Sequence, residues 1–353
     1  MGPFWNIPSF FNSLAKHCAS HCPPLPRCRF LIYRGLIWHN TNLRRWQARV
    51  KHLMTLIVKR MHPHFFAEVS GVDLATSFGS DILTEVVNAF AEHSVLLFRN
   101  QVLNDQSQIA FSERMGPLEK NITATFGNSR PEISKISNVD VNGNVLKKGS
   151  DDEIFLKGNS VWHTDSSFKI VPALGSALSA REVPPVGGET EFADMRAAYD
   201  ALDDGKKQLI QNLTSVHSFA YSQRQMSVDG RYNVNAVMSD EELEALPPVQ
   251  HPMIRVHPES GRKAIYVGRH ASHIVGLPVE EGRALIKELN EFSTQPEFVY
   301  RHNWQAGDLV MWDNRMVMHR GRAYDPKYKR VMHRTTIAGH AENNPWVVRE
   351  KVA

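Results

Sequence analysis

Cysteine is nearly absent from this chain of 353 residues. Its three cysteines, Cys18, Cys22 and Cys28, all lie near the start, and residues 54–353 contain none. A body without cysteine forms no disulfides, which fits a reducing compartment, so we expect the protein to be cytoplasmic. The chain also lacks any run of eighteen or more apolar residues, so the sequence predicts no membrane-spanning helix and no membrane partner. No internal repeat is visible in the sequence.

Acidic residues are missing from the beginning of the chain, where the first is Glu68. Residues 1–53 contain eight of the 41 Lys and Arg residues and none of the 37 Asp and Glu residues. The formal net charge of +4 therefore comes from this segment, and the rest of the chain is mildly acidic. An acidic body argues against nucleic acid as a partner.

Residues 1–53 are basic, contain all the cysteine, and show no helical or strand period. Three interpretations are open. Basic segments without acids are typical of organellar targeting peptides. A small metal site is the second, although Cys-x3-Cys-x5-Cys lacks the paired spacing of a zinc finger and would need His17 or His21 as fourth ligand. We favour the third, in which 1–53 is a disordered extension or a misplaced start, and Met54 opens a single domain over 54–353.

The pattern after Met54 predicts short strands around several helices. Apolar residues recur at helical spacing over 81–93 and 280–292, Asp105 is expected to cap a helix that runs toward Met115, and Asp194 opens another. Short strands are expected over 56–58, 67–74 and 94–99, and a loop over the polar, Gly-rich stretch 123–152. Numerous short strands with Gly and Pro turns favour a mainly β fold with helical insertions, a double-stranded β-helix or jelly roll.

Candidate metal ligands occur in the stretch 162–168, Trp-His-Thr-Asp-Ser-Ser-Phe. On an extended strand alternate side chains share one face, so we expect His163 and Asp165 to point the same way. Two histidines and one carboxylate are the ligands of non-haem iron(II) sites, and they leave the opposite side of the metal open. A lone His-x-Asp pair is weak evidence in a chain with 17 histidines. His319, far downstream in a strand-like stretch, would complete the set.

Two arginines follow the downstream histidine. Arg330 and Arg334 lie eleven and fifteen residues after His319, and alternation on a predicted strand places both on one face with Met332. A buried arginine requires an anionic partner, and its planar fork suits a carboxylate. Two such arginines beside a metal indicate two bound carboxylates, unless one or both pair with the protein's own acids. His333 is directed to the other face and is excluded as a ligand.

These motifs together resemble the taurine dioxygenase family of iron(II)- and 2-oxoglutarate-dependent dioxygenases. The resemblance extends from about Leu56 to about Gly339, in order and without large gaps. It is carried by five stretches, 162–168, 183–192, 194–202, 268–273 and 307–315. It implies an enzyme that uses Fe(II) as cofactor, 2-oxoglutarate as co-substrate and O2.

The resemblance also implies roles for particular residues. Three would be the metal ligands and catalytic centre: His163, Asp165 and His319. Two would hold the distal carboxylate of 2-oxoglutarate: Thr190 and Arg330. Two would contact the primary substrate, the first at its acidic group: Arg334 and His217. From its position four residues before His163, Asn159 is also expected to point into the substrate pocket.

Four further residues are assigned from the pattern around them. Trp162 and Trp312 flank the candidate metal ligands, and we expect them to wall the metal pocket. His270 and His273 lie in a Gly-flanked stretch, and we interpret them as structural or pocket-lining.

The substrate implied by the resemblance is a small aromatic acid, an aryloxyalkanoate such as 2,4-dichlorophenoxyacetate. Hydroxylation of the carbon that bears the ether oxygen would give an unstable hemiacetal, which falls apart to a phenol and glyoxylate beside succinate and CO2. Two alternatives stay open. The first is the same chemistry on taurine, another sulfonate or a small carboxylate, since Arg334 would serve either anion; the motifs at 194–200 and 312–315 favour the aryl acid. The second is a non-catalytic cupin-like binding protein. The sequence leaves a homo-oligomer open.

Overall fold

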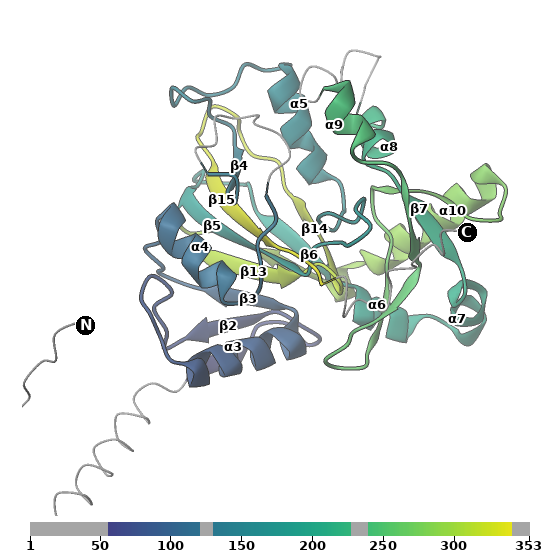
Figure 1. Cartoon of the computed structure of the whole chain (residues 1–353), viewed down its shortest axis with the longest axis horizontal. Helices are drawn as coiled ribbons and strands as arrows, with labels where there is room; N and C mark the ends of the chain where they lie inside the picture. Colours follow the sequence, from purple (N-terminus) through teal and green to yellow (C-terminus); the bar gives the residue numbers. More distant parts are fainter. Residues whose placement is uncertain (1–55, 121–129, 227–238, 341–353) are drawn as a thin grey trace, which may run out of the picture. The chain divides into compact units, whose positions relative to one another are not determined.

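The computed structural model describes residues 56–120, 130–226 and 239–340 (Figure 1). All of them belong to one compact unit, Met54–Ala353. The expectations for residues 1–53 and for a start at Met54 lie outside the described residues, as does part of the expected loop over 123–152.

Seven strands form the largest sheet, in the order β1-β2-β3-β13-β5-β15-β4. Neighbouring strands are antiparallel, except that β2 and β3 are parallel. The strands are β1 (Ile57–Arg60), β2 (Ala67–Ser70), β3 (Val95–Phe98), β4 (Ser134–Ser137), β5 (Gly175–Glu182), β13 (Leu309–Asp313) and β15 (Val331–Ile337). The strand expected over 67–74 is β2, which ends earlier because Gly71 takes a left-handed φ of 92°.

A second sheet has the order β12-β6-β14 and is antiparallel throughout. Its strands are β12 (Val299–His302), β6 (Thr190–Asp194) and β14 (Val317–Gly321). Two smaller sheets contain β7 (Thr214–His217), β8 (Val249–Pro252) and β11 (Ala271–Ile274), and β9 (Ile254–Val256) with β10 (Lys263–Ile265).

Side chains of β13 alternate between two hydrophobic layers. Val310 and Trp312 lie in a cluster with Phe192 of β6, so this cluster joins the large sheet to the three-stranded sheet. The alternate positions of β13 pack with residues of α3 (Ser80–His93) and α4 (Asp105–Glu113), which lie along the other face of the large sheet (Figure 1). The described chain is therefore mainly β with helices, as the sequence predicts.

The long helices lie close to where their patterns predict them. The remaining helices are α5 (Asp151–Lys157), η1 (Gly158–Ser160), α6 (Met195–Ala201), α7 (Asp204–Ile210), α8 (Phe219–Arg224), α9 (Asp240–Glu244), α10 (Val279–Ser293) and η3 (Pro296–Phe298). Asp194 caps α6 by accepting a hydrogen bond from the backbone of Arg196. The cap of α4, however, is Asn104 and not Asp105, because Asn104 and Ser107 form a reciprocal capping box.

The loop expected over 123–152 is confirmed over residues 138–150, but it is wrong at 134–137 and at its end. Residues 134–137 form β4, which pairs with β15, and α5 begins at Asp151. β4 has only one neighbour in the sheet, so it is an edge strand. Edge strands are often polar, which is why the composition of this stretch suggested a loop. Among the described residues, no helix combines the length and apolar character that a membrane crossing requires.

Candidate active site

Two histidines that are distant in sequence face each other across a backbone bridge. The amide of His163 donates to the carbonyl of His319 at 3.1 Å, and the amide of His319 donates back at 2.8 Å. This bridge adds the His163 stretch to the edge of β14. The two imidazole rings consequently lie 4.2 Å apart, centre to centre.

A turn that starts at Asp165 places its carboxylate near the two histidines. The extended strand that we expected through Asp165 is therefore wrong. Only His163 pairs with a strand, and a turn starts at Asp165, where Ser166 takes a left-handed φ of 56°. The carboxylate oxygens of Asp165 lie 3.8 Å from Nε2 of His163 and 3.9 Å from Nε2 of His319. Potential ligand atoms of the three residues are all within 4.8 Å of one another, and no other described group of His, Cys, Asp and Glu converges in this way.

The protonation states of these three side chains suit a metal. Burial lowers the pKa of His163 well below its ordinary value and the pKa of His319 to about 4, so both imidazoles are neutral near pH 7. Burial opposes ionisation of Asp165, but Arg334, His319 and His163 hold the pKa of its carboxyl well below the usual range. Nδ1 of His163 contacts the Val161 carbonyl at 2.7 Å, which leaves Nε2 with its lone pair.

Packing, rather than hydrogen bonding, orients the second histidine. Its ring lies 4.6 Å from the ring of Trp312 and 6.1 Å from that of Phe192, and it stacks on the latter. Nδ1 of His319 is buried and has no hydrogen-bond partner among the described residues. Trp312 therefore lies against a candidate ligand, whereas Trp162 stacks under the guanidinium of Arg320 at 4.6 Å.

Arg330 lies just before β15 and is nearly buried, with 8% of its surface exposed. Its Nε donates to the carbonyl of Gly188 at 3.2 Å, and it forms no ion pair with any described carboxylate. Burial lowers the pKa of this guanidinium. Gly188 has a φ of +74°, and a Cβ there would lie 3.3 Å from the Arg330 side chain, so glycine permits this approach. Thr190, two residues on, is buried at the start of β6 and accepts a hydrogen bond from Trp304 at 2.9 Å.

Arg334 lies on β15 and contacts one of the candidate metal ligands, Asp165. Its Nη1 donates to Oδ1 of Asp165 at 2.6 Å. The expectation that an arginine pairs with the protein's own acid therefore holds for Arg334 and not for Arg330. His333 points the other way, where its Nδ1 contacts Asp105 of α4 at 2.6 Å. The side chain therefore lies on the face that strand alternation predicts.

The two other predicted substrate residues, Asn159 and His217, have hydrogen-bond partners close to them in sequence. Asn159 is in η1, and its side chain donates to the carbonyl of Leu156 at 3.2 Å. His217 on β7 is fully buried, contacts Ser215 at 3.0 Å and stacks on the ring of Tyr266. Within the described residues neither side chain is hydrogen-bonded to the three candidate ligands, so their role remains a prediction.

A small aromatic cluster borders the candidate ligands. The ring of Phe168, three residues after Asp165, lies 4.9 Å from both the Phe219 ring and the His270 ring. Burial lowers the pKa of His270, and the neighbouring Arg269 and His163 lower it further. The sequence prediction of a structural or pocket-lining histidine is compatible with this place. Phe219 was not predicted, because it lies on α8, far from the ligand motif in sequence.

Asn314 and Ser176 are also missing from the sequence prediction. Asn314 accepts hydrogen bonds from the backbone of Asp165 at 3.1 Å and from the Trp312 indole at 2.9 Å, and it donates to Ser176 at 2.9 Å. Ser176 in turn donates to Oδ2 of Asp165 at 2.6 Å. The sequence shows Asn314 only as part of a polar turn, and nothing in the sequence links Ser176 to it.

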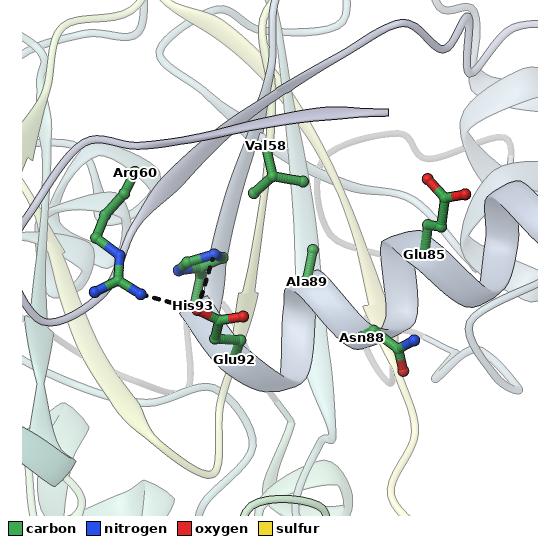
Figure 2. A pocket seen from close by; sticks show the side chains of 7 residues that line it. All are labelled: Val58, Arg60, Glu85, Asn88, Ala89, Glu92 and His93. Carbon is green, nitrogen blue, oxygen red and sulfur yellow. Dashed lines mark hydrogen bonds and ion pairs between the residues drawn. The ribbon is translucent and has the colours of Figure 1, made fainter. Parts of the chain in front are cut away.

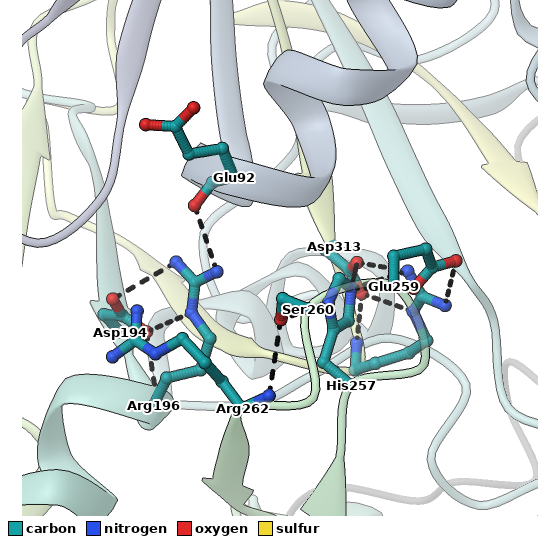
Figure 3. A network of polar contacts seen from close by, with 9 residues as sticks. Glu92, Asp194, Arg196, His257, Glu259, Ser260, Arg262 and Asp313 are labelled. Carbon is teal, nitrogen blue, oxygen red and sulfur yellow. Dashed lines mark hydrogen bonds and ion pairs between the residues drawn. The ribbon is translucent and has the colours of Figure 1, made fainter.

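Other buried charges form closed networks away from the candidate ligands (Figure 3). Arg196 is fully buried and pairs with Asp194 at 3.0 Å. Asp313 pairs with Arg315 at 2.6 Å and with His257 at 3.0 Å. Each of these charges is neutralised inside the protein, so we interpret them as structural.

A hollow of about 480 Å³ lies elsewhere, between β1 and α3 (Figure 2). It is lined by Val58, Arg60, Glu85, Asn88, Ala89, Glu92 and His93. Arg60 already pairs with Glu92 at 2.8 Å. None of the predicted site residues takes part, and we assign this hollow no function.

Comparison with known proteins gives one consistent result. The model of the taurine catabolism dioxygenase TauD, TfdA family matches residues 58–336. The chain is 44% identical over 294 residues to the alpha-ketoglutarate-dependent 2,4-dichlorophenoxyacetate dioxygenase of Cupriavidus pinatubonensis, a match that covers 82% of this chain and 99% of that protein. It is 40% identical to the (S)-phenoxypropionate/alpha-ketoglutarate-dioxygenase of Sphingobium herbicidovorans, over 78% of this chain and 92% of that protein. The crystal structure of AAD-2 in complex with Mn(II) and N-oxalylglycine superposes with a TM-score of 0.73 at 42% identity, over 81% of this chain and 98% of that one.

Proposed function

Because the chain belongs to the TauD, TfdA family of dioxygenases, we propose that it is an iron(II)- and 2-oxoglutarate-dependent dioxygenase whose primary substrate is an aryloxyalkanoate. The family relationship supports the class of enzyme. The particular residues and the particular substrate are argued below from the site.

His163, Asp165 and His319 would hold the iron. Two neutral imidazoles and one ionised carboxylate are the donor set that suits iron(II) and leaves positions for substrates. Bound iron, together with O2 and 2-oxoglutarate, supplies the oxidant for hydroxylating a C–H bond, while 2-oxoglutarate becomes succinate and CO2. The protein's part is to hold the reactants in place and to exclude water.

The single observation that carries this proposal is that the Arg330 guanidinium pairs with no carboxylate among the described residues. A buried cation without a counter-charge is costly, so a ligand that brings a carboxylate would be stabilising there. The far carboxylate of 2-oxoglutarate supplies that charge, with Thr190 as a further hydrogen-bond partner. N-oxalylglycine, which accompanies Mn(II) in the AAD-2 structure, has two carboxylates of the same kind.

The substrate would be held at two ends. Arg334 would meet its acidic group, after exchanging or sharing the contact with Asp165. The aromatic ring would pack against Phe168, Phe219 and His270, since aromatic surfaces favour edge-to-face and stacked neighbours. We keep Asn159 and His217 as further pocket residues.

Hydroxylation would occur at the carbon between the ether oxygen and the carboxylate. One oxygen atom of O2 enters this C–H bond and the other enters succinate. The resulting hemiacetal breaks its bond to the aryl oxygen, which takes the hydroxyl proton. The products are a phenol and, from a phenoxyacetate, glyoxylate.

Taurine or another sulfonate is the second candidate substrate, because Arg334 would bind either anion. The aromatic cluster and the relatives named for phenoxy acids support the aryl acid instead. A non-catalytic binding protein is disfavoured, because all three ligand side chains are present and converge.

The test is succinate release by the purified protein with Fe(II) and 2-oxoglutarate. The acceptors are a panel of phenoxyacetates, cinnamates and taurine. We expect phenoxyacetates to give the highest kcat/KM, with one phenol released per succinate. A higher kcat/KM for taurine would show that the substrate is a sulfonate. If no acceptor gives succinate, the protein is not a dioxygenase and only a binding function is left.

We also propose that the fold is a double-stranded β-helix. The large sheet and the β12-β6-β14 sheet would be its two faces, supported by the hydrophobic cluster that Trp312 and Phe192 share. In such a fold the ends of adjacent strands can present ligands from distant sequence positions to one site.

A further inference from the structure

We infer that Asn314 and Ser176 are positioning residues that fix the Asp165 carboxylate for metal binding. This inference rests on the proposed function, because it takes His163, Asp165 and His319 as the metal site. Neither residue touches the proposed metal or a substrate. Both act through Asp165.

The donors around Asn314 fix the orientation of its side-chain amide. The Asp165 backbone nitrogen and the Trp312 indole nitrogen can only donate, so the atom that faces both of them must be the amide oxygen. The amide nitrogen is thereby turned toward Ser176, whose hydroxyl oxygen lies 2.9 Å away. Asn314 is 1% exposed, so water does not compete for these bonds.

The direction of the Ser176 hydroxyl follows from that orientation. Its oxygen accepts from Asn314, so its proton is directed to Oδ2 of Asp165, at 2.6 Å. A hydrogen bond to an ionised carboxylate is short and about twice as strong as a neutral one. The chain Asn314–Ser176–Asp165 thus holds one carboxylate oxygen in a fixed direction.

The opposite oxygen of Asp165 is held differently. Arg334 donates to Oδ1 at 2.6 Å, but the proposed substrate competes for this guanidinium. Ser176 is fully buried on β5, opposite Trp312 in the sheet, and has no such competitor. The Ser176 bond therefore persists through substrate binding, while the Arg334 bond is exchanged or shared.

Asn314 also reaches the second ligand segment. By accepting from the Trp312 indole, it holds the ring that packs against His319 at 4.6 Å. One amide thus couples the turn that carries Asp165 to the ring that supports His319. Outer partners of this kind typically change metal affinity by about 10- to 100-fold when removed.

The experiment compares Ser176→Ala with Ser179→Ala in the full-length protein. Both hydroxyls are buried on β5, and both donate at 2.6 Å, but Ser179 bonds to Gln108 of α4 and not to the candidate ligands. Metal-free protein is titrated with Mn(II) alone, and free Mn(II) is counted by electron paramagnetic resonance. We expect Ser176→Ala to weaken binding by roughly 10- to 100-fold, and Ser179→Ala to leave it within about twofold of wild type.

Two further variants decide the remaining outcomes. Ser176→Thr keeps the hydroxyl and should restore most of the affinity, whereas a purely structural role would not depend on the hydroxyl. Asn314→Ala should weaken Mn(II) binding at least as much as Ser176→Ala. Wild-type affinity in Ser176→Ala, or equal losses in Ser176→Ala and Ser179→Ala, would overturn the inference. If His163→Ala also binds Mn(II) like wild type, the proposed metal site itself fails, so the two failures are distinguishable.

Discussion

Two buried arginines differ in the partners that surround their charge. Arg196 is fully buried, and its Nε and Nη2 both reach the carboxylate of Asp194, at 3.0 and 3.3 Å (Figure 3). Arg330 is nearly as buried, yet the one partner that its guanidinium has among the described residues is the Gly188 carbonyl. Burying a charge without a counter-charge is costly, and a bound ligand of opposite charge would offset that cost.

Two buried carboxylates make the same contrast. Asp313 is satisfied by Arg315 and His257, both within 3.0 Å. Asp165 has Ser176 and Arg334 within hydrogen-bond distance, but the two imidazole nitrogens stay 3.8 and 3.9 Å away. That separation is too long for a hydrogen bond and leaves a space that a metal ion would fill.

The largest effect is expected from the candidate ligands. His163→Ala, Asp165→Ala and His319→Ala should each abolish succinate formation, by more than the roughly 100-fold that outer partners cost. The matched control is His333→Ala, because His333 is next to Arg334 on β15 but its side chain contacts Asp105 of α4. Near-wild-type turnover in any of the three at saturating Fe(II) would remove that residue from the metal site.

The next effect concerns stability and sharpens the comparison of the two arginines. Arg196→Met would leave the buried Asp194 carboxylate unpaired and should lower the free energy of unfolding by about 3–5 kcal/mol. Arg330→Met removes a cation that has no carboxylate partner among the described residues, so the metal-free protein should lose little or no stability. Urea unfolding of both variants at pH 7 measures this, with a constant m-value as the condition for comparison. Equal losses would mean that Arg330 is as structural as Arg196.

A smaller effect is expected on the Michaelis constants. Arg330→Ala should raise KM for 2-oxoglutarate, and Arg334→Ala should raise KM for the phenoxyacetate. Each loses a charge-assisted bond, which is about 1.5–3 kcal/mol, or roughly 10- to 100-fold. Initial rates of succinate release with one substrate varied at a time provide both constants. The reverse pattern would exchange the two assignments along β15.

The sequence points to the candidate ligand residues because their chemical types and local spacing are visible in it. His163 and Asp165 are two apart, and the alternation around Arg334 correctly placed His333 on the opposite face. The extended strand through Asp165 was wrong, because the turn there is set by the Asn314 side chain, which accepts from the Asp165 backbone. A local sequence pattern cannot predict a contact between residues that are 149 positions apart.

The residues that hold Asp165, namely Ser176 and Asn314, could not be predicted for the same reason. Ser176 and Asn314 are 138 positions apart and meet because β5 and β13 pair in one sheet. A polar turn and an ordinary strand serine are all that the sequence shows of them. Likewise, the capping of α4 by Asn104 depends on a reciprocal bond with Ser107, which competes with the equally plausible cap at Asp105.

The smallest effect is expected at the aromatic cluster, where the comparison is between a pocket ring and a core ring. Phe219→Leu removes one ring from the cluster with Phe168 and His270, and an aromatic pair is worth about 0.5–1.5 kcal/mol beyond its burial. We therefore expect KM for a phenoxyacetate to rise roughly 2- to 10-fold, with KM for 2-oxoglutarate unchanged. Phe298→Leu, in the hydrophobic core beside α6, should lower stability without changing either constant. If Phe219→Leu behaves like Phe298→Leu, the aryl ring does not bind at this cluster.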